Sequence, residues 1–146
     1  MKVLIDKRQK FYVDSANVFK LCEVKQISGV ISALSIPNIV YIMRKELDVE
    51  RIREILDNLS LIFSIADLKG DDLRKAAKMN FKDYEDAVQS CCAVRIKADY
   101  IITRNVKDFI ESKVTAIEPY ELLERIFRIL TSTGILEFWG ILGTDL

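Results

Sequence analysis

Short apolar runs alternate with amphipathic stretches along most of the chain. The run KVLI at residues 2–5 is continuous and contains branched side chains, which is typical of a strand buried on both faces. Comparable runs predict further strands at residues 29–34, 61–66, 99–103 and 114–117.

Between these strands, apolar residues recur at the spacing of a helix that buries one face. In the first half of the chain, one helix is predicted to begin at Asp14 or Ser15. Another is predicted from Ser35, with Pro37 in its first turn, and a third from Asp48. The expected buried stripes are Val18, Leu21 and Cys22, then Ile36, Ile39, Val40 and Met43, then Val49, Ile52, Ile55, Leu56 and Leu59.

The second half of the chain continues the alternation. Asp71 or Asp72 is predicted to cap a short helix, Asp83 to open a longer one and Pro119 to begin the last. Strands and helices that alternate with short connections predict a parallel sheet covered by helices. The expected buried stripes are Leu73, Ala76 and Ala77, then Ala87, Cys91 and Val94, then Leu122, Leu123, Ile126, Phe127 and Leu130.

The chain is expected to form one domain, because it contains no internal repeat, low-complexity segment or linker rich in glycine and serine. We place this domain at residues 1–130. The segment 131–146, TSTGILEFWGILGTDL, fits neither a helix nor a strand well. It is either an irregular terminus packed on the domain or a contact between subunits, and the sequence leaves both open.

The composition argues against several classes of protein. Charged residues make up 30% of the chain and the net charge is zero, so no overall field attracts nucleic acid or an anionic membrane. No segment reaches the roughly 18 apolar residues of a membrane span, and the start of the chain lacks the pattern of a secretion signal. A cytoplasmic protein is therefore expected. The three cysteines lack the spacing of a zinc site and are expected to be reduced and buried.

Histidine is absent from the chain. Its absence removes the Ser-His-Asp and Cys-His mechanisms, histidine general bases and mixed histidine–cysteine metal sites. Carboxylate, lysine, tyrosine and hydroxyl groups remain for any chemistry at an active site.

Acidic and amide side chains follow two of the predicted strands. Asp6 ends the first strand, Asn105 and Asp108 follow the strand at residues 99–103, and Asp86 lies at the start of the preceding helix. Ligands of open parallel sheets bind beyond the carboxyl ends of the strands, so these side chains are expected to share a crevice. Converging carboxylates repel one another unless a cation neutralises them. Ligation by oxygen alone suits Mg²⁺ or Mn²⁺.

Such an ion can activate a water and stabilise the charge that gathers on a phosphate, so the acids predict phosphodiester hydrolysis. Each acid also has a structural interpretation. Asp83 suits an N-cap, Asp86 gains stability near a helix N-terminus, and Asn105 and Asp108 suit a turn. The residues themselves leave both interpretations open.

Four segments, in this order, resemble the PIN-domain family, and most closely its bacterial toxin–antitoxin branch, the VapC-type ribonucleases. They are MKVLID, ISALSIPNIVYIMRK, DYEDAVQSCCA and ADYIITRNVKDF, the last followed by VTAIEPYELL. The resemblance spans roughly residues 1–125. It implies a three-layer α/β/α sandwich around a parallel sheet and the cleavage of single-stranded or structured RNA with magnesium or manganese.

The resemblance and the predicted crevice together give a hypothesis for the site. Asp6, Asp86 and Asp108 match the acids of the family and are the predicted catalytic residues and metal ligands. The branch often has an asparagine where this chain has Asn105, which is the remaining predicted ligand. The supporting residues are Asp83, Asn38 and Thr103, and the residues expected to hold substrate phosphates are Arg104 and Lys107.

The chain departs from the family at two places. Many relatives carry a glutamate where this chain has Asn38, and they normally continue after the first aspartate with Thr-Asn or Ser-Asn, whereas here Asp6 runs directly into KRQKFY. These departures favour an alternative in which the chain is a PIN-like interaction or RNA-binding module without turnover. An aspartyl-phosphate mechanism at Asp6 is disfavoured, because the acid expected two residues later is Arg8.

The resemblance also implies partners. RNA is the expected substrate, an antitoxin protein is expected to block the active groove, and a second copy of the chain is expected to form a homodimer.

Overall fold

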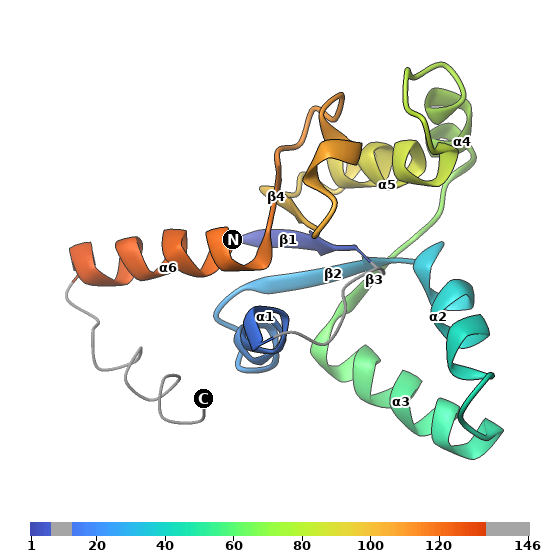
Figure 1. Ribbon diagram of the computed structural model, residues 1–146, viewed down its shortest axis with the longest axis horizontal. Coiled ribbons are helices and arrows are strands. Elements are labelled where there is room, and N and C mark those ends of the chain that lie inside the picture. The colour runs from blue at the N-terminus through green and yellow to red at the C-terminus, as the bar shows by residue number, and fades with distance from the viewer. Residues whose placement is uncertain (7–12, 134–146) are drawn as a thin grey trace.

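The computed structural model describes residues 1–6 and 13–133 and contains a five-stranded sheet in the order β3-β2-β1-β4-β5 (Figure 1). All four strand pairs are parallel, as the alternating sequence pattern predicted. The strands are β1 Lys2–Ile5, β2 Ser28–Ser32, β3 Ser64–Ala66, β4 Tyr100–Ile102 and β5 Ala116–Ile117.

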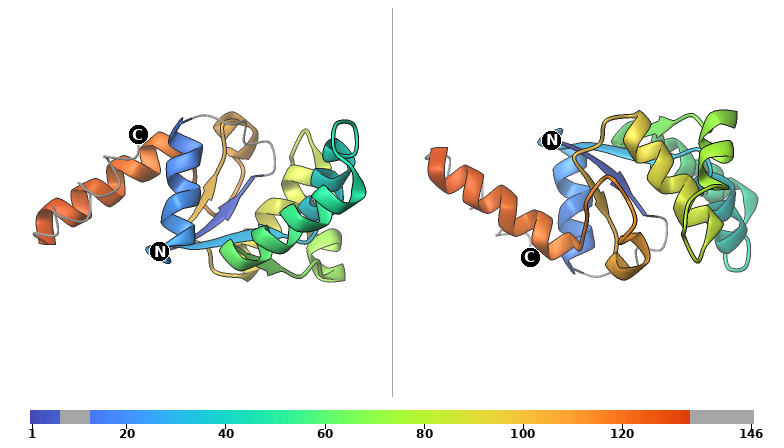
Figure 2. Two further views of the ribbon diagram at one scale, coloured as in Figure 1. Left: turned by 90° about the horizontal axis from the view of Figure 1, so that it is seen from below. Right: turned by 90° about the horizontal axis from the view of Figure 1, so that it is seen from above.

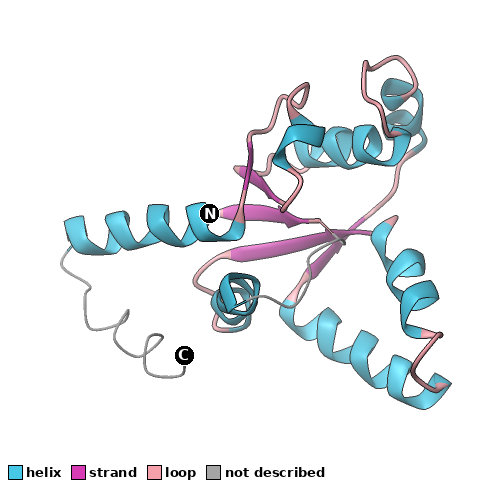
Figure 3. Cartoon of the chain, in the orientation of Figure 1, coloured by secondary structure: helices cyan, strands magenta, loops and turns pink. Residues whose placement is uncertain are grey.

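Helices cover both faces of this sheet (Figure 3). Helix α1 packs against α3 and α6 on one face, and α4 packs against α5 on the other. Figure 2 shows α6 extending from one side of the sheet and the α2–α3 pair standing at the opposite side. The helices are α1 Val13–Glu23, α2 Ser35–Met43, α3 Val49–Ile62, α4 Gly70–Ala76, α5 Tyr84–Arg95, the 3₁₀ helix η1 Val106–Phe109 and α6 Pro119–Thr133.

The central strand β1 is buried on both sides, which explains its continuous apolar sequence. Val3 and Ile5 belong to a cluster with residues of α1 and α6, such as Val18 and Leu122. Leu4 points to the opposite face and packs with Cys92 of α5. Because successive strand residues alternate between faces, a strand between two helical layers needs apolar residues at every position. The predicted three-layer α/β/α sandwich is confirmed.

The predicted cap at Asp83 is confirmed, and Asp48, where a helix was predicted to begin, is the N-cap of α3. The Asp48 carboxylate accepts a hydrogen bond from the Arg51 N–H at 2.8 Å, and the Asp83 carboxylate accepts one from the Asp86 N–H at 3.1 Å. Each carboxylate satisfies an N–H that has no partner within its own helix.

The other predicted caps are wrong by a few residues. Helix α1 begins at Val13, so Asp14 and Ser15 lie in its first turn rather than before it. Leu34, not Ser35, precedes α2, and Lys69 precedes α4. In α4, the Asp72 carboxylate accepts a hydrogen bond from the Lys69 N–H at 3.3 Å. This acid therefore binds the backbone of the N-cap residue from a position within the first turn.

The predicted strand at residues 61–66 is shorter than expected, because α3 continues to Ile62 and β3 begins at Ser64. Most of the predicted apolar stripes are buried at least in part. At four positions, the helical spacing predicted burial that the structure does not show. The exposed exceptions are Val49, Ala77, Val94 and Phe127.

All three cysteines are free and buried, as predicted. Among residues 1–6 and 13–133, no helix is both long and apolar enough to cross a membrane. Residues 131–133 belong to α6, whereas the rest of the predicted C-terminal segment lies outside the described residues, so its role stays a prediction. The KRQKFY stretch after Asp6 also lies outside them.

Candidate active site

The register of the two central strands places Asp6 beside Thr103. Strands β1 and β4 run parallel with Ile5 opposite Ile102, so the residues that follow them leave the sheet at the same edge. The Asp6 N–H donates to the Ile102 carbonyl at 3.0 Å, which continues the ladder by one bond. The Thr103 hydroxyl then donates to Asp6 Oδ2 at 2.7 Å.

Both members of this pair are buried, with 3% of Asp6 and none of Thr103 exposed. A carboxylate in such a place loses hydration and depends on donors that remain in fixed positions. The β1–β4 register therefore creates a buried acid whose orientation is set by a neighbouring hydroxyl group.

The segment after Thr103 forms a turn held by its backbone. The Asn105 N–H donates to the Thr103 hydroxyl at 3.0 Å, and the Asp108 N–H donates to the Asn105 carbonyl at 2.9 Å. The Asn105 side chain makes no capping bond to η1. The turn is thus held by main-chain groups of Asn105 and Asp108.

Asp86 lies in the first turn of α5 and is only 6% exposed. Its backbone N–H is bound by the Asp83 carboxylate, so the cap fixes the turn that carries Asp86. Asp83 is exposed and has a structural role, as its N-cap interpretation predicted. The same carboxylate lies close enough to Asp86 to share a pocket with it.

A pocket of about 700 Å³ brings several of the predicted residues together. Asp83, Asp86, Lys107 and Asp108 are all in its lining, which combines the start of α5 with the region of η1. The other predicted residues, Asp6, Asn38, Thr103, Asn105 and Arg104, are not among the residues that line it. The full lining consists of Asn80, Phe81, Lys82, Asp83, Asp86, Lys107, Asp108, Ile110 and Glu111.

Asn38 contacts an acid that the sequence interpretation did not single out. Its side-chain amide donates to Glu85 Oε1 at 2.9 Å and to the Leu34 carbonyl at 3.1 Å. Helix α2 therefore has no acid at position 38, but Asn38 hydrogen-bonds the carboxylate of Glu85, which belongs to α5. The sequence signal was present, since Glu85 directly precedes Asp86, but only the packing of α2 against α5 reveals the pair.

A second polar contact joins the same two helices. Gln89 Nε2 donates to the Ser35 hydroxyl at 2.8 Å, and the Ser35 and Ser32 hydroxyls lie 3.2 Å apart. Gln89 and Ser35 are buried, whereas most polar residues at helix surfaces are not. The two contacts fix α2 against the part of α5 that carries Asp86.

The donor types suit a hard divalent cation, because the predicted ligands are carboxylate and amide oxygens. In the parts of the chain that the structure describes, no three acidic or cysteine side chains are already gathered into a group that could hold an ion. The predicted donors therefore fit Mg²⁺ or Mn²⁺ in their chemistry.

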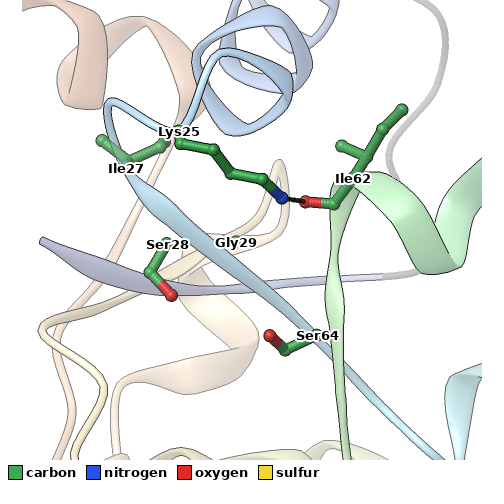
Figure 4. Close-up of a pocket in the computed structure, with 6 residues that line it drawn as sticks. All are labelled: Lys25, Ile27, Ser28, Gly29, Ile62 and Ser64. Atoms are coloured by element: carbon green, nitrogen blue, oxygen red, sulfur yellow. Dashed lines mark hydrogen bonds between the residues drawn. The ribbon is translucent and has the colours of Figure 1, made fainter.

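A smaller pocket of about 210 Å³ lies at the opposite edge of the sheet, where β2 and β3 begin (Figure 4). Its one charged lining residue, Lys25, donates to the carbonyls of Leu61 and Ile62 at 3.0 and 3.3 Å. These carbonyls belong to the last turn of α3, where a cation stabilises the helix end. Lys25 has a structural role there.

The comparisons with known proteins agree with this fold. The family model described as "PIN domain" matches residues 1–107. A chain in the crystal structure of VapBC2 from Rickettsia felis, bound to a DNA fragment from their promoter, aligns with a TM-score of 0.64 at 16% identity. The alignment covers 81% of this chain and 98% of that one. No curated protein matches significantly.

Proposed function

The chain belongs to the PIN-domain family, and we propose that it is a metal-dependent endoribonuclease that hydrolyses phosphodiester bonds of RNA. The observation that supports this most directly is the buried Asp6 carboxylate held by Thr103 at the edge where β1 and β4 end. In open parallel sheets, this edge is where ligands bind. Asp86 and Asp108, which line one pocket, supply the further acids.

In this proposal, Asp6, Asp86 and Asp108 would hold Mg²⁺ or Mn²⁺, with the side-chain oxygen of Asn105 as a further ligand. When bound, the ion supplies activation of water and neutralisation of the charge on the phosphate. Thr103 orients Asp6 by its hydrogen bond. Asp83 fixes the first turn of α5 through the Asp86 N–H.

Two basic residues would hold the substrate. Arg104 and Lys107 lie in the segment between Thr103 and Asp108, and Lys107 lines the same pocket as the acids. Phosphate contacts of this kind position a nucleic acid without reading its sequence. Asn38 would support the site indirectly, through its hydrogen bond to Glu85.

The test is cleavage of a labelled RNA by the purified full chain in the presence of Mn²⁺ or Mg²⁺. We expect Asp86→Asn and addition of a chelator to abolish cleavage. The matched control is Asp57→Asn, which changes an exposed acid of α3 and should leave cleavage unchanged. Cleavage that persists in Asp86→Asn, or in excess chelator, would sink the proposed mechanism.

A second candidate is a PIN-like module that binds RNA or protein without turnover. It is favoured by the two departures from the family, which are Asn38 in place of a glutamate and the segment after Asp6 that runs directly into KRQKFY. Calorimetric titration with Mn²⁺ separates the two candidates. The nuclease should bind Mn²⁺ below millimolar concentration and lose this binding in Asp86→Asn, whereas the inactive module should bind the ion only weakly in both.

We further propose that the protein is the toxin of a toxin–antitoxin pair and forms a homodimer in the cytoplasm. The fold shared with a chain of a VapBC2 complex supports this proposal. Expression of the chain alone should arrest growth, and co-expression of a small protein encoded beside it should relieve the arrest and co-purify with the chain. Unimpaired growth without any partner would count against a toxin, and a monomeric mass in solution would count against the dimer.

A further inference from the structure

We propose that Gln89 and Ser90 are positioning residues of the nuclease site, which hold the part of α5 that carries Asp86 between α2 and the segment that follows η1. This inference rests on the proposed nuclease function. It adds two uncharged residues to the site, about one helical turn after Asp86, which act on that acid through the placement of their helix.

Helix α5 carries a polar stripe although it is buried. Every residue from Asp86 to Ala93 is buried. The polar stripe consists of Asp86, Gln89 and Ser90, whose exposed fractions are 6%, 3% and 0%. They stand at positions i, i+3 and i+4, so they share one side of the helix. Buried polar groups lose their hydration, and a stripe of them weakens a fold unless hydrogen bonds compensate.

The Gln89 side chain joins α5 to α2. Its Nε2 donates to the Ser35 hydroxyl at 2.8 Å, and Ser35 is buried in the first turn of α2. The Ser35 hydroxyl also lies 3.2 Å from that of Ser32, the last residue of β2. This contact therefore reaches from α5 through α2 to the sheet.

The Ser90 hydroxyl joins α5 to its other neighbour. It lies 2.7 Å from the Ser112 hydroxyl, in a hydrogen bond where either group can donate. The Ser112 N–H donates at 3.0 Å to the carbonyl of Phe109, the last residue of η1. Asp108 belongs to the same short helix. Ser90 therefore ties the helix that carries Asp86 to the segment that carries Asp108.

One atom of Gln89 is not satisfied by the fold. Its Oε1 is buried and accepts no hydrogen bond from residues 1–6 or 13–133. An unpaired acceptor of this kind destabilises a protein, whereas an apolar side chain of similar shape avoids the loss. Packing alone therefore does not explain a glutamine at this position. Local features that cost stability concentrate at functional sites, and Gln89 lies about one turn from Asp86.

Hydrogen bonds set the orientation of α5 more closely than apolar packing can. Apolar contact is non-directional, whereas a hydrogen bond weakens steeply away from its preferred angle. Bonds from Gln89 and Ser90 to two different neighbours limit rotation of the helix about its axis. Such a rotation would move Asp86 relative to Asp108, which lines the same pocket. Because metal ligands need placement within about 0.5 Å, the two residues affect ion binding without touching the ion or the RNA.

The main test replaces Gln89 with methionine, which has a similar length and shape but no amide. The Ser35 hydroxyl keeps its contact with Ser32, so the change removes one hydrogen bond and the unpaired Oε1 together. We expect the urea midpoint of the full chain to stay the same or rise. Mn²⁺ affinity, measured by calorimetry, and kcat for cleavage of a labelled RNA should each fall about tenfold. KM for the RNA should not change, because the proposed role of Gln89 involves no contact with the substrate.

Ser90→Ala is the second variant. It removes a single oxygen atom and leaves Ser112, which is half-buried and therefore within reach of water. It should lower Mn²⁺ affinity and kcat by a similar factor, again at constant KM.

The matched control is Val88→Ala in the same helix. Val88 is 1% exposed and lies two residues after Asp86, on the side of α5 opposite the polar stripe. Loss of its methyl groups should lower the urea midpoint and leave Mn²⁺ affinity and kcat unchanged. A merely structural role of Gln89 and Ser90 predicts instead that function falls only where stability falls.

Measurements on the unmodified chain keep the two proposals apart. Mn²⁺ binding and cleavage that are present in the unmodified chain and unchanged in Gln89→Met and Ser90→Ala overturn the positioning role and retain the nuclease. An equal loss of Mn²⁺ affinity in Val88→Ala and Gln89→Met also overturns the positioning role. An unmodified chain that neither binds Mn²⁺ nor cleaves RNA overturns both proposals.

Discussion

The Thr103 hydroxyl donates a hydrogen bond of 2.7 Å to the Asp6 carboxylate across 97 residues of sequence. Both residues directly follow strands, β1 and β4, which lie side by side in the sheet. The same hydroxyl accepts the N–H of Asn105, so one side chain joins the first acid to the loop that carries Asp108. This contact makes Thr103 a positioning residue of the proposed site.

Replacing Thr103 with valine tests that role. Valine keeps the shape of threonine but cannot donate to Asp6 or accept from Asn105, so a buried carboxylate and an N–H lose a partner. We expect the free energy of unfolding to fall by about 1–3 kcal/mol. We expect Mn²⁺ affinity and RNA cleavage to fall about 10 to 100-fold. Urea denaturation, calorimetry and the cleavage assay measure these effects.

Thr103→Ser is the matched control, because it keeps the hydroxyl and removes only a methyl group. It should retain most of the Mn²⁺ affinity that valine loses. Equal Mn²⁺ affinity in the two variants would show that the hydroxyl does not orient Asp6.

Asn38→Ala should separate Glu85 from α2. The Asn38 amide donates to Glu85 at 2.9 Å, and alanine removes this hydrogen bond between α2 and α5. We expect the cleavage rate to fall about tenfold. The control is Asn58→Ala, which changes an exposed asparagine of α3 and should leave the rate as it is. An unchanged rate in Asn38→Ala would contradict a role for the Asn38–Glu85 pair.

Gly29→Ala should destabilise the fold. A Cβ atom at Gly29, which Figure 4 places on β2, would lie 2.5 Å from Cys22 Sγ and 2.7 Å from the Phe63 ring. Both neighbours are buried and cannot move without disturbing the core between β2 and α1. Overpacking of this kind costs about 1–3 kcal/mol of unfolding free energy.

Gly70→Ala is the comparison for this change. Its Cβ would meet only the Arg74 guanidinium at 3.3 Å, which lies on a flexible and exposed side chain. Helix α4 should gain slightly from the loss of a glycine. Urea denaturation of both variants measures the difference. Equal stability would show that the core around Gly29 accommodates an added methyl group without strain.

Cys22 should make stability depend on pH in the alkaline range. Burial raises the pKa of the Cys22 thiol from its usual 9.0 to about 12, an effect that nearby Lys25 only partly offsets. Between these values, the unfolded chain releases the thiol proton while the folded chain keeps it. The unfolded state therefore binds fewer protons, and the free energy of unfolding falls as pH rises from about 9 towards 12.

The measurement is urea denaturation at several pH values in this window for the unmodified chain and for Cys22→Ala. The lysines and tyrosines titrate in both proteins, so the difference between the two slopes isolates the thiol. Stability of Cys22→Ala should fall less steeply with pH. Parallel slopes would contradict the raised pKa of Cys22.

The sequence by itself determined the layered fold. Continuous apolar runs such as residues 2–5 identified strands buried on both faces, and helical spacing identified the helices between them. This works because apolar residues recur at the period of the element whose face they bury. The helix starts at Asp48 and Asp83 could also be predicted, since an acid before an apolar stripe can accept hydrogen bonds from the backbone N–H groups of the first helical turn. Other helix starts, such as that of α2 after Leu34, were not, because helix ends fray and their assignment varies by one or two residues.

The sequence also named the acids but did not relate them to one another. Only the parallel register of β1 and β4 decided that Thr103 binds Asp6, and only the packing of α2 on α5 decided that Asn38 binds Glu85. The pocket that joins Lys82 and Ile110 to Asp86 likewise depends on loops brought together by the sheet. The physical reason is that periodicity records which face of an element is buried, whereas contacts between distant residues arise from the register and docking of whole elements.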